Sequence, residues 1–222
     1  MIKRFNEMKS ASLLAAVAAA ALHAPAAAQP AAAHDGFARV GVARLKLADK
    51  GGLAMDGAPI AGAGYTTPEK WMGSFDLGYF VGKTIAVQVA GTTPVKTPNL
   101  PNGTLDGTPN LGTDKFSLFT ATATWHPLRG GTVSPYVGAG LEWFHVWSIR
   151  DELADNLDVK DKVGPVIQAG AEFNLNERFG VYIDAKKAFI KTKASANLGP
   201  SAVTAEPQLD PFILQAGAVV RF

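Results

Sequence analysis

The chain has 222 residues, a formal net charge of +2, 47% hydrophobic residues and no cysteine. This length suits one or two domains, and the lack of cysteine leaves burial and sheet closure, rather than disulfides, to stabilise the fold. Without Lys3, Arg4, Glu7 and Lys9, which belong to an amino-terminal leader, 18 basic side chains balance 18 acidic ones. This balance argues against a nucleic-acid partner, which would need a basic surface.

The first 28 residues have the organisation of a secretory signal peptide. A positive segment precedes an alanine-rich apolar run from Ser10 to Leu22, and three alanines ending at Ala28 form a small-residue cleavage site. We expect residues 1–28 to be removed and residues 29–222 to form one mature domain. The alternative, an amphipathic helix, lacks polar residues at helical spacing. Because no later stretch reaches the roughly 20 apolar residues of a membrane helix, export leaves a soluble periplasmic protein or an outer-membrane barrel.

Beyond the leader, eight segments of about ten residues show the period-two alternation of β-strands. They are about Phe37–Leu47, Trp71–Val81, Ile85–Ala90, Phe116–His126, Ser134–Trp147, Val163–Phe173, Phe179–Phe189 and Asp210–Phe222. Long connections over about 48–68, 92–114, 149–162 and 191–209 alternate strictly with short ones. That rhythm is typical of tilted membrane-barrel strands joined by long outer loops and short periplasmic turns.

Local patterns add three expectations. The first strand alternates imperfectly, which predicts a bulge near Ala43 to Leu45. The connection over 92–114 contains four prolines and therefore can hold neither a helix nor a central strand. Asp151 to Leu157 is charged and compatible with a helix, which predicts one helical turn in the third long loop.

The two faces of the strands differ in charge. In the closing strand one face is fully apolar, from Phe212 to Phe222, and the other is mixed. A soluble, lipocalin-like barrel of eight strands would carry its charges outside. Here the charges fall on the mixed face: Arg39, Asp76, Glu142, Glu172, Asp184, Lys186 and Arg221. The sequence therefore predicts an all-β fold: an eight-stranded antiparallel up-and-down transmembrane β-barrel with its apolar face in lipid, four long outer loops and short periplasmic turns.

Three short motifs resemble one family of small outer-membrane proteins. Ser134 to Leu141 resembles the RPYVGAG-type strand of the OmpW family, the closing Leu209–Phe212 and Val220–Phe222 are similar to its LDPW…YRF ending, and Asn174 to Phe179 looks like one of its periplasmic turns. The chain departs from the family where Phe212 replaces a tryptophan. It departs again before the fourth strand, where the usual Leu-Pro-Pro segment is absent.

The resemblance implies a monomeric barrel that takes up small apolar solutes and releases them sideways into the membrane. It also implies outer-membrane lipid and the barrel-assembly machinery as partners, with the terminal Phe222 as the assembly signal. No cofactor is implied. Aromatic residues near strand ends, Trp71 among them, fit the girdles at membrane interfaces.

The inward positions suggest two layers inside the barrel. Buried charges must pair, which predicts a lumen charge plug in the periplasmic half. Its residues are Arg39, Asp76, Glu172, Asp184 and Arg221. The outer half is predicted to have an apolar lining. Its residues are Trp71, Phe144, Val166 and Ile213. The alternative is that all these side chains simply fill the barrel, because eight strands enclose an interior just wide enough for them.

Other functions remain open at this point. One is a structural or surface-binding barrel that acts through its long loops without transport. Another is a lipid hydrolase, for which Glu142 and His145 are the nearest candidates, but residues three apart on a strand project to opposite faces. His34, His126 and His145 lack the spacing of metal ligands, so neither a metal nor enzyme activity is predicted.

Overall fold

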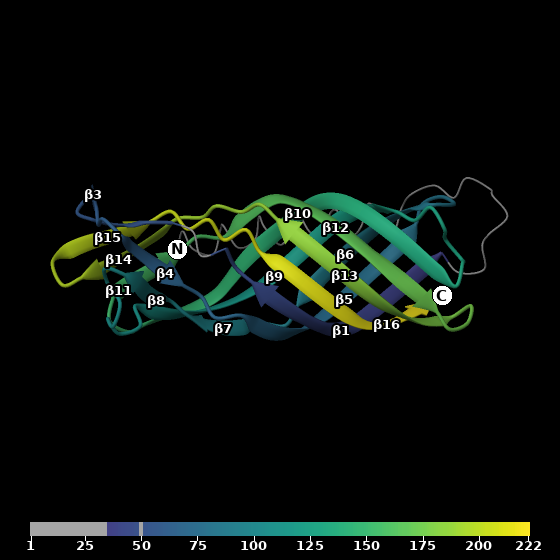
Figure 1. Cartoon of the computed structure of the whole chain (residues 1–222), viewed down its shortest axis with the longest axis horizontal. Coiled ribbons are helices and arrows are strands. Elements are labelled where there is room, and N and C mark those ends of the chain that lie inside the picture. The colour runs from purple at the N-terminus through teal and green to yellow at the C-terminus, as the bar shows by residue number, and fades with distance from the viewer. Residues whose placement is uncertain (1–34, 49–50) are drawn as a thin grey trace, which may run out of the picture.

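The computed structural model describes residues 35–48 and 51–222 of the chain. The predicted leader lies outside the described residues. Eight long antiparallel strands form the main body of the molecule (Figure 1). They are β1 (Gly36–Lys46), β5 (Lys70–Phe80), β6 (Ile85–Thr92), β9 (Gly112–Trp125), β10 (Val133–Asp151), β12 (Lys162–Asn174), β13 (Phe179–Ala188) and β16 (Phe212–Arg221).

The eight strands close into a barrel. Each pairs with its neighbour along the chain, and the first and last strands, β1 and β16, pair from Phe37↔Arg221 to Lys46↔Phe212. Reciprocal backbone hydrogen bonds of 2.9 Å between Gly36 and Phe222 complete this junction. Closure pairs the first barrel strand with the last, so that neither is left as an unpaired edge in lipid. The predicted eight-stranded antiparallel barrel is confirmed.

Eight shorter strands come from the four long connections. They are β2 (Leu53–Met55), β3 (Ala58–Pro59), β4 (Ala63–Thr66), β7 (Val95–Pro98), β8 (Leu100–Gly103), β11 (Asp155–Val159), β14 (Ala194–Leu198) and β15 (Ser201–Ala205). Five of them form a sheet in the order β11-β14-β15-β2-β3, and β4 pairs with β8. These pieces extend the molecule beyond one end of the barrel (Figure 1). Pairing between loops satisfies backbone groups that the barrel itself cannot reach.

Two local predictions were wrong. The predicted helical turn over Asp151 to Leu157 is absent, and strand β11 begins at Asp155 instead. The carboxylate of Asp151 accepts the backbone N–H groups of Asn156 and Leu157 at 3.0 Å, and Asn156 has a φ of 53°. This local side-chain bonding competes with helical hydrogen bonds. Among the described residues, no helix is long and apolar enough to cross a membrane.

The predicted bulge in the first strand is also absent, because β1 keeps an unbroken register with both neighbours. Ala43 and Leu45 are buried while Arg44 between them is exposed, so the alternation continues in spite of the residue types. The barrel has a register shift elsewhere, between Val146 and Ser148 of β10. There the strand passes from the barrel into the outer extension.

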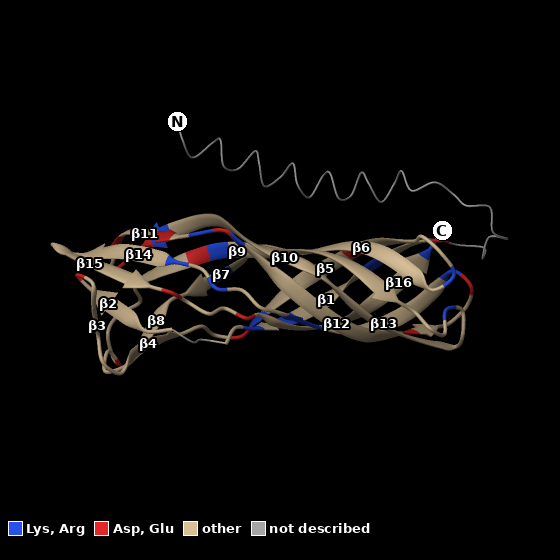
Figure 2. Cartoon of the chain, turned by 90° about the horizontal axis from the view of Figure 1, so that it is seen from above, with Lys and Arg blue, Asp and Glu red and all other residues tan. Residues whose placement is uncertain are grey.

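The two faces of the barrel wall differ as the alternation predicts. Large apolar side chains are exposed outside, such as Val40 at 63% and Leu141 at 53%, whereas Arg39 and Glu142 are buried inside. Most of the wall is free of Lys, Arg, Asp and Glu (Figure 2). An apolar exterior around a charged interior is the reverse of a soluble barrel and the arrangement of a membrane one.

Candidate functional site: a layered barrel lumen

Arg39 is the centre of a buried group of charged side chains. Its Nη2 lies 2.5 Å from Oε1 of Glu172, and its Nη1 lies 3.7 Å from Oδ2 of Asp76. The guanidinium also donates to the hydroxyl of Tyr136 at 3.1 Å and lies 4.7 Å from the centre of that ring. The planar guanidinium group of Arg39 contacts several partners at once, and these contacts offset much of the free-energy cost of burying its charge.

The remaining charges join the same group, which we call the lumen charge cluster. Nζ of Lys186 lies 3.3 Å from Oδ1 of Asp184 and 3.9 Å from Oδ1 of Asp76. Arg221 contacts the second oxygen of Glu172. The structure thus brings all five residues predicted for the plug into one cluster. Its members are Arg39, Asp76, Glu172, Asp184, Lys186 and Arg221.

Lys186 and Tyr136 belong to this site but were not assigned to it from the sequence. Tyr136 bridges the cluster, because its hydroxyl donates to Asp184 at 2.8 Å and accepts from Arg39. Both residues fall on the inward face of their strands, which is a signal that alternation could supply. Gly170 gives the tyrosine room, since a Cβ there would lie 2.5 Å from the Tyr136 hydroxyl oxygen. Gly170 is the ladder partner of Tyr136 on the neighbouring strand, and its lack of a side chain lets the tyrosine ring lie over it.

An aromatic layer fills the lumen on the short-turn side of the cluster. Phe37 and Phe80 lie 5.7 Å apart, and the buried His126 ring contacts Phe80 at 4.9 Å and Tyr136 at 4.8 Å between centres. Arg129 covers Phe80 at 3.7 Å and pairs with Asp35 at 2.7 Å. This end of the barrel is therefore packed with side chains.

An apolar layer fills the lumen on the side of the long loops. Phe144, Val166 and Ile213, all predicted for the outer lining, are about 2% exposed or less and pack in one cluster. We call this cluster the apolar layer. Its buried members are Ala43, Leu45, Leu47, Met72, Phe116, Leu118, Phe144, Val166, Ala188, Ile190, Leu209 and Ile213.

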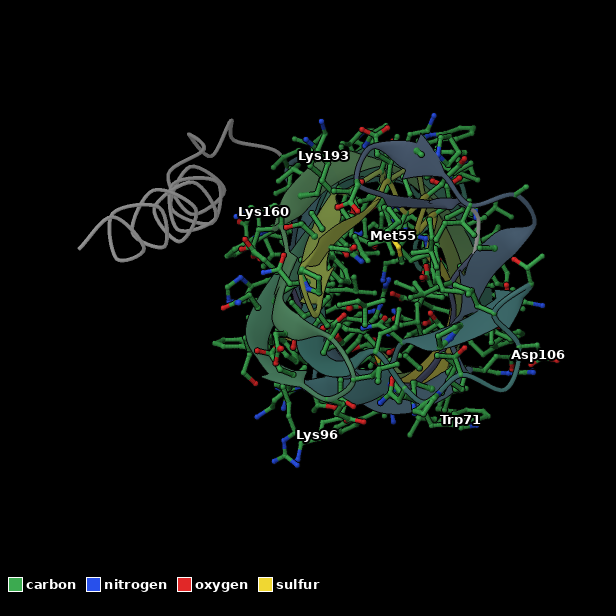
Figure 3. The ribbon with its side chains drawn as sticks, turned by 90° about the vertical axis from the view of Figure 1, so that its left-hand side faces the viewer. Met55, Trp71, Lys96, Asp106, Lys160 and Lys193 are labelled. Atoms are coloured by element: carbon green, nitrogen blue, oxygen red, sulfur yellow. The ribbon has the colours of Figure 1, made fainter. Side chains whose placement is uncertain are left out.

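The assignment of Trp71 to this lining was wrong. Its side chain is 69% exposed on the outside of the barrel, and it lies at the outer edge in the view along the barrel (Figure 3). Trp71 has the same parity as Phe75 on β5, so it shares the lipid-facing side. Met72, the next residue, occupies the lumen position and is 5% exposed.

A cavity of about 80 Å³ lies between the apolar layer and the outer extension. Phe116 and Phe144, whose rings are 4.8 Å apart, contribute to its lining, as do Leu53 and Val203 of the outer sheet. Polar groups are few. They are supplied mainly by Tyr65, Thr67, Thr97, Asn99, Asp114, Ser195 and Thr204. An apolar lining with a few polar groups is the composition of sites that bind small apolar ligands.

Glu142 lies between the apolar layer and the lumen charge cluster. Its side chain is fully buried, and neither carboxylate oxygen has a hydrogen-bond partner among the described residues. His145 is on the opposite side of β10, where its Nδ1 lies 2.7 Å from Asp161 and its ring packs against Trp143 and Trp147. The two residues proposed as a hydrolase pair therefore do not meet. Among residues 35–48 and 51–222, no group of acidic and histidine side chains has metal-site geometry.

Replacing Glu142 by glutamine should leave the barrel's free energy of unfolding within about 1 kcal/mol of the wild type or raise it, because neither carboxylate oxygen has a hydrogen-bond partner among the described residues that the substitution would remove. The matched substitution Glu172→Gln, in a carboxylate that has two arginine partners, should destabilise it. Urea-dependent unfolding in lipid vesicles measures both changes. A loss of stability in Glu142→Gln equal to that in Glu172→Gln would show that Glu142 has a stabilising partner in the native barrel.

A closed antiparallel barrel with a lipid-facing apolar wall and a filled, charged lumen defines a bacterial outer-membrane β-barrel protein. Residues 35–222 match the sequence model of the OmpW family, and the chain belongs to that family. Its strands therefore lie in the outer membrane of a bacterium.

Individual relatives show the same relationship. The chain is 30% identical over 140 residues to the dibenzothiophene metabolism operon protein PahQ of Pseudomonas aeruginosa, covering 63% of this chain and 66% of that protein. It is 26% identical over 149 residues to the outer membrane protein AlkL of Ectopseudomonas oleovorans, covering 67% and 65%. The chain thus spans about two thirds of the length of these relatives.

Solved structures share the fold. The outer membrane protein OprG from Pseudomonas aeruginosa superposes with a TM-score of 0.80 at 23% identity, covering 86% of this chain and 96% of that one. AlkL in DMPC lipid bilayers gives a TM-score of 0.68 at 24% identity, covering 89% and 94%.

Proposed function

We propose that this barrel admits small hydrophobic molecules from outside the cell and passes them sideways into the outer membrane. The observation that carries the proposal is the order of the layers along the lumen. The apolar cavity opens onto the apolar layer, and the buried Glu142 and then the lumen charge cluster lie beyond it. An apolar solute gains by entering the first two layers and loses by crossing the third.

The lumen charge cluster acts in this proposal as a plug. Its ion pairs are desolvated, with side chains of Arg39 and Asp76 fully buried, and the aromatic layer fills the lumen beyond it. Eight strands leave little space beyond their own side chains. A solute that reaches the apolar layer therefore has a path of low cost only through the wall.

The wall has a seam on the side of the long loops. Strand β6 pairs with β5 as far as Thr92↔Ser74, but the chain then turns at Pro94, and β7 pairs with β9 alone. In the described structure, Lys70 to Met72 of β5 have no ladder partner on this side, and only Thr93 contacts Gly73 through hydrogen bonds of 2.9 Å. Proline lacks the N–H that would continue the ladder.

The seam adjoins the apolar layer. Met72 belongs to that layer, and Val95 of β7 packs against it. Opening the seam would break few backbone hydrogen bonds and would expose apolar side chains to lipid rather than water. These features support lateral exit of the solute between β5 and β7. We call this part of the wall the β5–β7 seam.

The name of PahQ suggests a solute. The name of that relative refers to the metabolism of dibenzothiophene, which is a flat, apolar, aromatic molecule. We propose small apolar aromatic or aliphatic solutes as the class carried here, with dibenzothiophene as the first probe. We also propose that the 1–28 leader directs export and that Phe222, 62% exposed at the barrel junction, is the assembly signal.

Uptake of dibenzothiophene into liposomes tests the proposal. Ile213→Trp adds bulk to the apolar layer and should slow uptake at least tenfold, whereas Leu214→Trp, the next residue on the lipid-facing side, should leave it within about twofold. Wild-type uptake no faster than that of empty liposomes would reject transport. A structural or loop-mediated surface-binding role would then replace it.

A further inference from the structure

A second cavity, of about 350 Å³, lies on the outer rim of the barrel. It lies between the start of β12, the segment that follows β13 and the segment that precedes β16. Its described lining is polar and is dominated by lysine. The residues are Gly51, Lys162, Lys191, Thr192, Lys193, Glu206 and Gln208. Roughly 300–1,000 Å³ is the usual size of small-molecule sites, so the cavity suits a ligand group larger than a single ion.

The charge of this lysine hollow is unbalanced. Among its described lining residues, three lysines face a single carboxylate, Glu206, which lies 3.4 Å from Lys193 and is itself 77% exposed at the side chain. Gln208 is held by its amide, which donates to Asp210 at 2.5 Å, and by a β-bridge to Lys191. The backbone on both sides of the hollow is therefore tied together. A fixed concave site with an excess of positive charge favours an anion.

The hollow adjoins the lipid-facing surface. Val163 follows Lys162 directly and is 50% exposed on the outside of β12, and Phe189, 49% exposed, lies two residues before Lys191. The outward positions of β13 run from Ile183 through Ala185 to Lys187, and Phe189 and Lys191 continue the same alternation just beyond the strand. This is where the hydrocarbon region gives way to headgroups. Basic residues at such a boundary attract anionic lipid headgroups.

We propose that the lysine hollow binds the phosphorylated sugar headgroup of an outer-leaflet glycolipid. Lysine ammonium groups bind phosphate as point charges, and the exposed Val163 and Phe189 contact the acyl chains below. This adjacency favours the lipid over free phosphate, because a soluble anion gains nothing from the apolar surface. The site is independent of transport.

The position of the hollow is compatible with lateral exit. Around the barrel, β16 and β1 lie between β13 and β5, and β10 and β9 lie between β12 and β7, so two strands separate the hollow from the β5–β7 seam on each side. Lys193 and Trp71, which marks the seam side, lie on opposite sides of the molecule in the view along the barrel (Figure 3). A bound glycolipid would hold one side of the rim and leave the seam free.

Native mass spectrometry of the full mature barrel in detergent, titrated with lipid A that carries two phosphates, measures the affinity. The triple variant Lys162→Gln, Lys191→Gln, Lys193→Gln should bind about a hundredfold more weakly, since each basic residue near an anionic headgroup contributes about fivefold. The control triple Lys46→Gln, Lys70→Gln, Lys96→Gln removes the same charge from the rim beside the seam and should change affinity less than about threefold. Glu206→Gln should tighten binding about fivefold.

Three results would overturn the proposal. Equal losses in the two triple variants would show that any rim charge suffices. No tightening in Glu206→Gln would place the anion elsewhere. Displacement of lipid A by millimolar inorganic phosphate would identify a free-phosphate site instead of a lipid site. Unchanged barrel closure in each variant, seen as heat-dependent mobility on gels, shows that the measurement concerns folded protein.

Discussion

Replacing Arg39 by leucine should destabilise the barrel by about 3–5 kcal/mol, the usual cost of removing one partner from a buried ion pair. Arg39 contacts Glu172, Asp76 and Tyr136, and none of these can turn to water because all are nearly fully buried. Asp76 would then keep Lys186, and Glu172 would keep Arg221, as the only cations paired with them among the described residues. Unfolding in urea, measured in lipid vesicles, gives the change in free energy.

Arg44→Leu is the matched control for this substitution. Arg44 lies on the same strand as Arg39 but faces outward. It pairs there with Glu69, and both side chains are partly exposed. Exposed pairs contribute about 0–1 kcal/mol, so this variant should unfold close to the wild type. An equal loss of unfolding free energy in the two variants would show that the lumen charge cluster contributes no more to stability than an exposed ion pair does.

Conductance tests the plug in the same variant. If the lumen charge cluster and the aromatic layer plug the lumen as proposed, planar bilayers with wild-type protein should show little current. Arg39→Leu loosens the cluster and should raise ion conductance several-fold above that of Arg44→Leu. A high conductance in the wild type would contradict the proposed plug.

A disulfide across the β5–β7 seam should reduce uptake of dibenzothiophene at least tenfold, and reduction should restore it. A Cβ built on Gly73 lies 3.9 Å from Cβ of Thr93, close to the mean of about 3.8 Å in disulfides. The double variant Gly73→Cys, Thr93→Cys therefore suits a bridge. Because the chain has no other cysteine, its connectivity is unambiguous. The bridge would join β5 covalently to the segment before β7, at the point where the β5–β6 ladder ends. This link restricts the separation of β5 from β7.

The two single-cysteine variants are the controls, since each carries one change and cannot form the bridge. In each of them uptake should be the same with and without oxidant. Equal uptake in the oxidised and reduced double variant would argue against exit through this seam. Entry by diffusion through the bilayer is subtracted with empty liposomes in every case.

Local alternation was enough to predict the barrel wall. On β5, β12 and β13 the buried carboxylates share one parity and the exposed large apolar residues share the other, so the lumen side of Asp76, Glu172 and Asp184 followed from position alone. Trp71 shows the limit of residue type as a guide. It is apolar and near a strand end, but its parity with Phe75 places it in lipid.

The long loops were not predictable in the same way. Strand β11 is stabilised by pairing with β14, almost forty residues later, and by the local bonds of the Asp151 side chain. Neither is visible as a period in the sequence, and the charged composition of this segment is equally compatible with a helix. The lysine hollow likewise joins Lys162 to Lys191 and Gln208 through loop packing.

The sequence by itself determined the number of strands, the lipid-facing side of each and the closure of the last strand on the first, because these depend on a two-residue period and on the order of long and short connections. Only the tertiary structure decided which charges pair, where the wall has its seam and where the lysines gather. Arg39 and Glu172 are 133 residues apart. Their contact depends on the tilt and stagger of the closed sheet, which no single strand encodes.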